Sequence, residues 1–185
     1  MRSLKTYLHE AKAIKLMILG GPGSGKSTYS EYISKHFDIP HIYPGDMLRK
    51  SDDPEVKALL AKGEFAPLDV VVKIIKQEIV KAPNGYILDG FPRNLEQLKE
   101  MQDSNIEINR VIYLDVSDAE VIRRLTARGR ADDTPEIVKN RLKVYQRETG
   151  PVVDYYKGKK EFHSINAEGD TAENIAKKII RDIEE

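Results

Sequence analysis

The sequence predicts a single α/β domain in which helices cover both faces of a parallel β-sheet, giving three layers. Short apolar runs alternate with helical patterns along the chain, and this alternation is typical of a parallel sheet. Hydrophobic residues make up 40% of the chain, which is enough to build a packed core. The length of 185 residues suits one domain with small inserted flaps and leaves no room for a second core.

Five apolar runs are predicted strands of this sheet, and helical patterns lie between and after them. The first strand runs into a glycine-rich turn, and two later strands end at or next to an aspartate. The predicted strands span residues 15–19, 40–43, 86–88, 111–116 and 161–166. The predicted helices span residues 27–36, 119–127 and 135–148, and about 171 to the end.

Two segments interrupt the alternation of strands and helices. Residues 45–72 contain two or three helical stretches with no strand between them, and residues 128–134 are short and polar. Additions of this kind beside the carboxyl ends of parallel strands are where ligands bind and lids move. We therefore divide the single domain into a core, a helical insertion and a very short lid, spanning about 1–43, 73–127 and 135–185 (core), 44–72 (insertion) and 128–134 (lid).

The composition excludes several classes of site and partner. The 30 basic and 30 acidic residues balance, which argues against binding nucleic acid through a global positive field. The absence of cysteine excludes disulfides and thiolate zinc sites, and it favours a cytoplasmic setting. No apolar stretch is long enough to span a membrane, and the charged N-terminal segment is not a secretory signal.

The N-terminal segment carries an apolar stripe at helical spacing, formed by Leu4, Tyr7, Leu8 and Ala11. We expect a short amphipathic helix packed on the core, with a contact between subunits as the alternative. The sequence does not decide between a monomer and a homo-oligomer.

Residues 20–27 match the phosphate-loop pattern G-x-x-x-x-G-K-[ST] without substitution, between a predicted strand and a predicted helix. Glycines let the backbone fold around a phosphate, and the following helix adds the positive end of its dipole. The lysine can bridge the outer phosphates, and the serine hydroxyl can bind Mg²⁺. The pattern predicts an ATP-type triphosphate site formed by Gly21, Gly23, Ser24, Gly25, Lys26, Ser27 and Thr28.

Two aspartates at strand ends are candidates for the acidic side of the magnesium site. Asp89 closes the third predicted strand and continues into the turn Gly90-Phe91-Pro92-Arg93, which places Arg93 in the same cleft. Asp115 closes the fourth strand, but it is followed by a segment typical of a strand exit and helix cap. We therefore expect Mg²⁺ at Ser27 and Asp89, partly through water.

The ordered set of motifs resembles the adenylate kinases, which are nucleoside monophosphate kinases with a P-loop NTPase fold. The motifs appear in the order found in that family, over nearly the whole chain from about residue 15, at residues 20–28, 45–49, 89–93, 129–133, 141 and 166–169. The resemblance implies a five-stranded parallel sheet, a helical monophosphate-binding insertion and a short lid. It also implies reversible phosphoryl transfer from Mg-ATP to AMP to give two ADP, the reaction of an ATP:AMP phosphotransferase.

The resemblance also implies roles for individual residues. The catalytic residues would be Lys26, Arg93, Arg128, Arg130 and Arg141. ATP would contact the phosphate loop together with Arg128 and Gly169. AMP would contact Gly45, Arg49, Glu64, Phe65, Ala66, Val71, Gly90, Arg93, Gln97, Arg130 and Arg141. Asp132 and Asp133 would orient the arginines of the lid.

The chain departs from the family pattern at two places. Only Gly129 separates Arg128 from Arg130, so the lid is very short and lacks the zinc site of long lids. We therefore expect loose selectivity for the donor base. Pro44 stands where threonine is usual, and proline has no donor to offer adenine, which keeps a UMP/CMP or broad-specificity kinase open. From a different class, a nucleotide-binding regulatory module without catalysis is the remaining alternative.

Overall fold

The structure is a computed structural model that describes residues 13–50, 54, 56–57, 67–129 and 133–185. The helix expected near the N-terminus lies outside these residues, and so do parts of the predicted insertion and lid.

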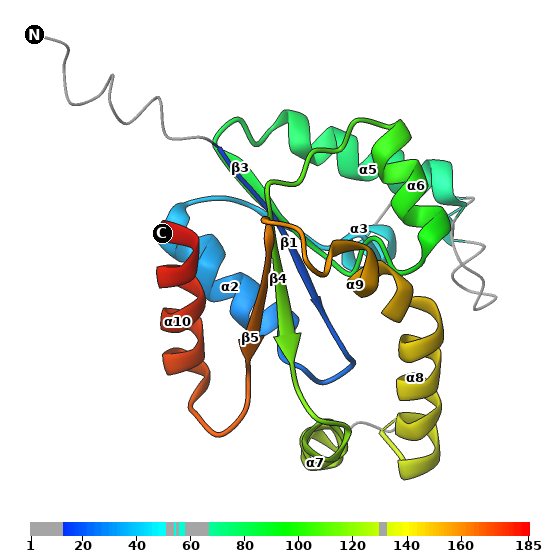
Figure 1. Cartoon of the computed structure of the whole chain (residues 1–185). Helices are drawn as coiled ribbons and strands as arrows, with labels where there is room; N and C mark the ends of the chain where they lie inside the picture. The colour runs from blue at the N-terminus through cyan, green and yellow to red at the C-terminus, as the bar shows by residue number, and fades with distance from the viewer. Residues whose placement is uncertain (1–12, 51–53, 55, 58–66, 130–132) are drawn as a thin grey trace, which may run out of the picture.

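Five parallel strands form one sheet with the order β2-β3-β1-β4-β5, so the glycine-rich turn follows the central strand (Figure 1). The strands are β1 (Ile14–Gly20), β2 (His41–Ile42), β3 (Gly85–Asp89), β4 (Arg110–Asp115) and β5 (Phe162–Asn166). Each of them overlaps a predicted strand. The three-layer α/β/α fold with a five-stranded parallel sheet, as in P-loop NTPases, is confirmed.

The sheet divides the core in two because successive side chains of a strand point to opposite faces. Leu16 and Ile18 of β1 pack in one buried cluster, and Met17 and Leu19 pack in the other. Helices α2 (Lys26–Phe37) and α10 (Ala172–Glu184) cover the first face (Figure 1). Helices α5 (Leu68–Val80), α6 (Leu95–Asp103) and α9 (Gly150–Tyr156) cover the second face.

Helices α6 and α9 are absent from the sequence prediction. Helix α6 is capped by Asn94, whose side chain accepts a hydrogen bond from the backbone of Gln97, a local signal for a helix start. The second is only seven residues long and opens with Gly150-Pro151, residues that are typical of turns. Both helices owe their place to packing on the sheet, since Leu98 and Val152 are buried there.

Three further helices lie near the carboxyl ends of the strands (Figure 1). They are α3 (Pro44–Lys50), α7 (Asp118–Arg128) and α8 (Pro135–Glu148). Ser117 and Thr134 cap the starts of α7 and α8, and the two helices share a small apolar cluster of their own. No helix in the described part of the chain is both long enough and apolar enough to cross a membrane.

Candidate active site

The glycine-rich turn between β1 and α2 forms the centre of the candidate site. Gly23 and Gly25 have positive φ values of 74° and 95°, which glycine adopts without strain. A Cβ added to Gly23 would lie 2.9 Å from Cγ of Leu125 on α7, so the loop also packs tightly against that helix. This close packing fixes the path of the loop just before Lys26, the first residue of α2.

Lys26 folds back over its own loop. Its Nζ donates hydrogen bonds of 2.7 and 2.8 Å to the carbonyl oxygens of Gly20 and Gly21. Burial lowers the pKa of Lys26 from 10.5 to about 8; the Asp89 carboxylate opposes this shift and the Arg93 guanidinium adds to it. The Asp89 carboxylate and the Arg93 guanidinium therefore lie near enough to Lys26 to influence its charge.

Ser27 and Asp89 meet at the carboxyl end of β3. The Ser27 hydroxyl donates a 2.9 Å hydrogen bond to Oδ2 of Asp89, whose side chain is almost completely buried. His41 Nε2 lies 3.1 Å from the same oxygen. Asp115, the other candidate acid, is exposed, and Ser117 caps the helix that follows it.

A hydroxyl beside a buried carboxylate, next to a loop that can hold phosphates, suits Mg²⁺. This ion takes one or two protein oxygens and completes its shell with water and phosphate oxygens. In the described ranges no group of three or more His, Cys, Asp or Glu side chains could hold a metal by itself. Ser27 and Asp89 thus fit a magnesium ion that is shared with a nucleotide.

The turn after β3 holds Arg93 through two local contacts. Its Nε donates a 2.8 Å hydrogen bond to the carbonyl oxygen of Gly90, and its backbone N–H donates to Oε1 of Gln97 at 2.7 Å. The Arg93 guanidinium is exposed, and it lies near enough to Lys26 to lower the pKa of that lysine. Gln97, expected to contact the acceptor base, here caps the turn that carries Arg93.

Arg49 lies on α3, near the same turn. Its Nη2 is 3.6 Å from Oδ1 of Asp46, and its Cζ lies 5.7 Å from the centre of the Tyr43 ring. The Tyr43 ring is close to Gly90, because a Cβ added there would lie 3.2 Å from Cε2 of Tyr43. Arg49 and Arg93 therefore flank one aromatic ring, although they are 44 positions apart in the sequence.

Arg128 and Arg141 share one buried carboxylate. Nε and Nη2 of Arg128 donate hydrogen bonds of 2.8 and 2.7 Å to the two oxygens of Asp133. Arg141 Nη1 donates to Oδ1 of Asp133 at 3.2 Å. Asp133 thus links Arg128 at the end of α7 to Arg141 on α8, and its negative charge holds the two positively charged guanidinium groups side by side.

Arg124 and Tyr145, which the sequence analysis left without a role, connect α7 and α8 to the phosphate loop. Arg124 donates hydrogen bonds to the carbonyl oxygens of Ser24, at 3.4 Å, and Ala167, at 2.5 Å. The Tyr145 ring lies 3.7 Å from the position of a Cβ on Gly21. Helical spacing could have revealed both, because Arg124 lies four residues before Arg128, and Tyr145 lies four after Arg141.

The other predicted site residues are less closely joined to this cleft. Val71 packs against the core from α5, and Gly45 lies in the first turn of α3 beside the Tyr43 ring. Gly169 has a φ of 70° in the turn after β5, with open space around it. Thr28 is exposed in the first turn of α2. Glu64, Phe65, Ala66, Arg130 and Asp132 lie outside the described residues.

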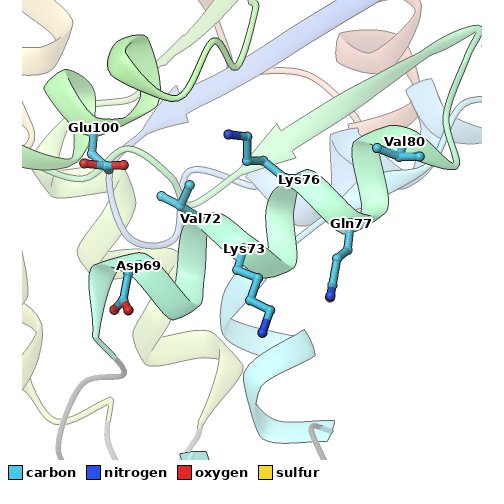
Figure 2. Close-up of a pocket in the computed structure, with 7 residues that line it drawn as sticks. All are labelled: Asp69, Val72, Lys73, Lys76, Gln77, Val80 and Glu100. Carbon is cyan, nitrogen blue, oxygen red and sulfur yellow. The ribbon is translucent and has the colours of Figure 1, made fainter.

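An open hollow of about 420 Å³ lies along α5, facing α6 (Figure 2). Its lining combines apolar Val72 and Val80 with the lysines Lys73 and Lys76. None of its lining residues belongs to the cleft described above. The hollow therefore forms no part of the candidate active site.

Comparisons with known proteins show the family of this chain. The family model described as "Adenylate kinase" matches residues 18–161. The adenylate kinase of Prochlorococcus marinus (strain MIT 9515) is 40% identical over 165 residues, covering 84% of this chain and 91% of that protein. The adenylate kinase of Leptospira biflexa (strain Patoc 1 / Ames) is 37% identical, covering 91% of this chain and 99% of that protein. The adenylate kinase of Mycolicibacterium smegmatis is 36% identical, covering 89% and 96%. The chain therefore belongs to the adenylate kinase family.

Proposed function

We propose that the chain transfers the terminal phosphoryl group of ATP to AMP, giving two ADP, in the cleft between the phosphate loop and Arg93. The observation that carries this proposal is the hydrogen bond from Ser27 to Asp89 beside the phosphate loop, because Asp89 leads directly into the turn that holds Arg93. A cation on the donor loop, a buried acid that can hold Mg²⁺ and an exposed arginine suit the meeting of a triphosphate with a monophosphate. Membership of the family, whose named relatives are adenylate kinases, favours AMP over CMP or UMP.

The chemistry needs no general base. The second pKa of a phosphate monoester is about 6, so the attacking oxygen of AMP is already ionised at neutral pH. The barrier is electrostatic, because two polyanions must meet in line while charge spreads over the transferred group. Cationic side chains that are held in place before substrates arrive lower this barrier.

The proposed donor side uses the phosphate loop, Lys26 and Arg128. Lys26 would exchange its two carbonyl acceptors, Gly20 and Gly21, for phosphate oxygens when ATP binds. Mg²⁺ at Ser27 and Asp89 would neutralise phosphate charge. Arg124 would stabilise this side indirectly, since it bonds both the loop and the segment that leads to Gly169, the proposed contact to the donor base.

The proposed acceptor side uses Arg49 and Arg93 for the phosphate of AMP. The base would lie against Val71, Gln97 and the segment that contains Glu64, Phe65 and Ala66. Arg130 and Arg141 would contact the transferred group. For Gln97 to bind adenine, its side chain would have to release the backbone of Arg93.

Residues 44–72 and 128–134 are the proposed flaps that exclude water, because water in the cleft would convert the enzyme into an ATPase. Helix α5 continues unbroken across residue 72, where the proposed insertion ends. The insertion would therefore move together with α5 or bend at a hinge close to it. We place the reaction in the cytoplasm, which a chain without cysteine suits.

Steady-state turnover with Mg²⁺, ATP and each of AMP, CMP, UMP and GMP tests the proposal. We expect the highest kcat/KM with AMP and two ADP formed per cycle. A higher kcat/KM with CMP or UMP would show that one of these nucleotides, and not AMP, is the preferred acceptor. Failure to form diphosphate with any of the four would favour a nucleotide-binding module without catalysis.

A further inference from the structure

Tyr43 occupies a central place in the acceptor half of the cleft, between β2 and α3. Its ring carbon Cε2 lies 3.4 Å from the position of a Cβ on Gly45 and 3.2 Å from that of a Cβ on Gly90. A Cβ on Gly45 would make ordinary van der Waals contact with the ring, whereas a Cβ on Gly90, where φ is 75°, would crowd it. The ring thus fills the space between the start of α3 and the turn that carries Arg93.

The ring is also held from the side of the sheet. It stacks on the His41 ring with an angle of 10° between the planes and 6.3 Å between the centres. His41 is in turn 3.1 Å from the buried carboxylate of Asp89. The Tyr43 ring is therefore held between the His41 ring and the tight turn at Gly90, and it presents an aromatic face to α3.

The Arg49 guanidinium lies against this face. Its distance of 5.7 Å from the ring centre is within the range of a cation–π interaction. Asp46 is the second contact, at 3.6 Å, and it also pairs with Lys50 at 2.6 Å. The Arg49 side chain is 59% exposed, so the Tyr43 ring and Asp46 are what restrict its long, flexible stem.

We propose that Tyr43 is a positioning residue for the acceptor monophosphate: its ring holds the Arg49 guanidinium in the orientation that binds the phosphate. This inference rests on the proposed function, because it assigns Arg49 to the acceptor. Preorganising the arginine reduces the side-chain entropy that is lost when the monophosphate binds. The role belongs to the aromatic face and not to the hydroxyl.

The test compares Tyr43→Leu with Tyr43→Phe. Leucine keeps an apolar side chain but removes the π face, so we expect KM for AMP to rise about two- to fivefold. KM for ATP should stay unchanged, which also shows that the variant is folded. Phenylalanine keeps the ring and should restore KM for AMP to the wild-type value.

A double-mutant cycle separates positioning from a general effect on the site. Once Arg49→Ala has removed the cation, adding Tyr43→Leu should change KM for AMP by less than about 1.5-fold. Tyr155→Leu is the matched control, because the Tyr155 ring also carries a cation, with Lys159 Nζ 3.3 Å from the ring centre, and neither residue belongs to the proposed site. It should change neither KM.

Three results would overturn the inference. The effects of Tyr43→Leu and Arg49→Ala on KM for AMP could be additive, or Tyr43→Leu could raise KM for AMP and KM for ATP equally. Tyr43→Phe could also fail to give the wild-type KM for AMP. AMP affinity measured by calorimetry keeps the inference separate from the proposed function. If wild-type protein bound AMP without turnover, the proposed function would fail, while the affinity cycle would still decide the role of Tyr43.

Discussion

Ser27 Oγ and Asp89 Oδ2 are joined by a 2.9 Å hydrogen bond that links the first turn of α2 to the end of β3. The two strands that lead to these residues are adjacent in the sheet, with Ile18 of β1 in register with Asp89. Because the strands are parallel and neighbouring, the hydroxyl and the carboxylate meet beside the phosphate loop. The sheet order thus determines where a nucleotide-bound magnesium ion would lie.

Asp89→Asn should raise the Mg²⁺ concentration needed for half-maximal rate and lower kcat about 10- to 100-fold. The amide keeps the shape of the side chain but removes the negative charge that favours the ion. Asp115→Asn is the matched control, since Asp115 also ends a strand but is exposed. Steady-state rates over a Mg²⁺ titration would measure both, and equal effects of the two substitutions would contradict the assignment of Asp89.

Arg93→Lys should lower kcat/KM for AMP about 10- to 100-fold although the positive charge is kept. A lysine presents a point charge and loses the planar fork that binds a phosphate with two hydrogen bonds. Arg123→Lys is the control, because Arg123 pairs with Glu120 on the exposed side of α7. A wild-type rate for Arg93→Lys would remove this residue from the acceptor site.

Most of the fold could be predicted from the sequence because its strands are short, apolar and bounded by turn residues. Strands β1, β3 and β4 follow this rule most clearly, whereas β2 and β5 contain polar residues such as His41 and Ser164. The long helix α10 has a clear amphipathic period. Helices α6 and α9 were missed because they are short, with nine and seven residues. The first buries only Leu98 and Met101, and the second begins with two turn-forming residues, so packing on the sheet decides their conformation.

The candidate site could be predicted only where a motif orders the residues locally. The phosphate loop and Asp89 are of this kind, and the structure brings Ser27 and Asp89 together. The contact of His41 with Asp89 and the bond from Arg124 to Ala167 join residues 48 and 43 positions apart. No local pattern encodes such contacts, because they exist only once the strands and helices have packed.

Gly85→Ala should destabilise the protein by several kcal/mol without any direct effect on the site. Gly85 has a φ of 127°, and a Cβ there would lie 2.1 Å from the carbonyl oxygen of Ile14 in the neighbouring strand. Gly158→Ala is the control, because Gly158 also has a positive φ, 85°, but open space around it, so only backbone strain of about 1–2 kcal/mol is expected. Chemical denaturation would compare the two, and equal losses would contradict the close approach at Gly85.

Glu120→Gln should reduce the amount of stability that the protein loses when the pH falls from 7 to 3. Hydrogen bonds from Arg123 and Arg124 lower the pKa of Glu120 from 4.5 to about 2. A carboxyl whose pKa is lower in the folded state stabilises the protein at pH values above its pKa in the unfolded state. This contribution is lost as the pH falls from about 4.5 toward 2. The wild type should therefore be more stable than the variant at pH 7, and the difference should shrink by pH 3.

Melting temperatures at pH 7 and pH 3 would measure this difference. Glu136→Gln, which also removes one exposed carboxylate, corrects for the change in net charge. A difference between wild type and Glu120→Gln that stays constant from pH 7 to pH 3 would show that the two arginines do not stabilise the ionised form of Glu120.

GTP, CTP and UTP should each support at least about a tenth of the kcat/KM seen with ATP, a difference of no more than about 1.4 kcal/mol in transition-state binding. Strong selection among bases requires buried polar groups that the wrong base leaves unpaired. The chain between Arg128 and Thr134 is too short to wrap a base, and the space around Gly169 is open. Initial rates with saturating AMP and each donor would decide, and discrimination of a thousandfold against the other three triphosphates would mean that other residues enclose the adenine.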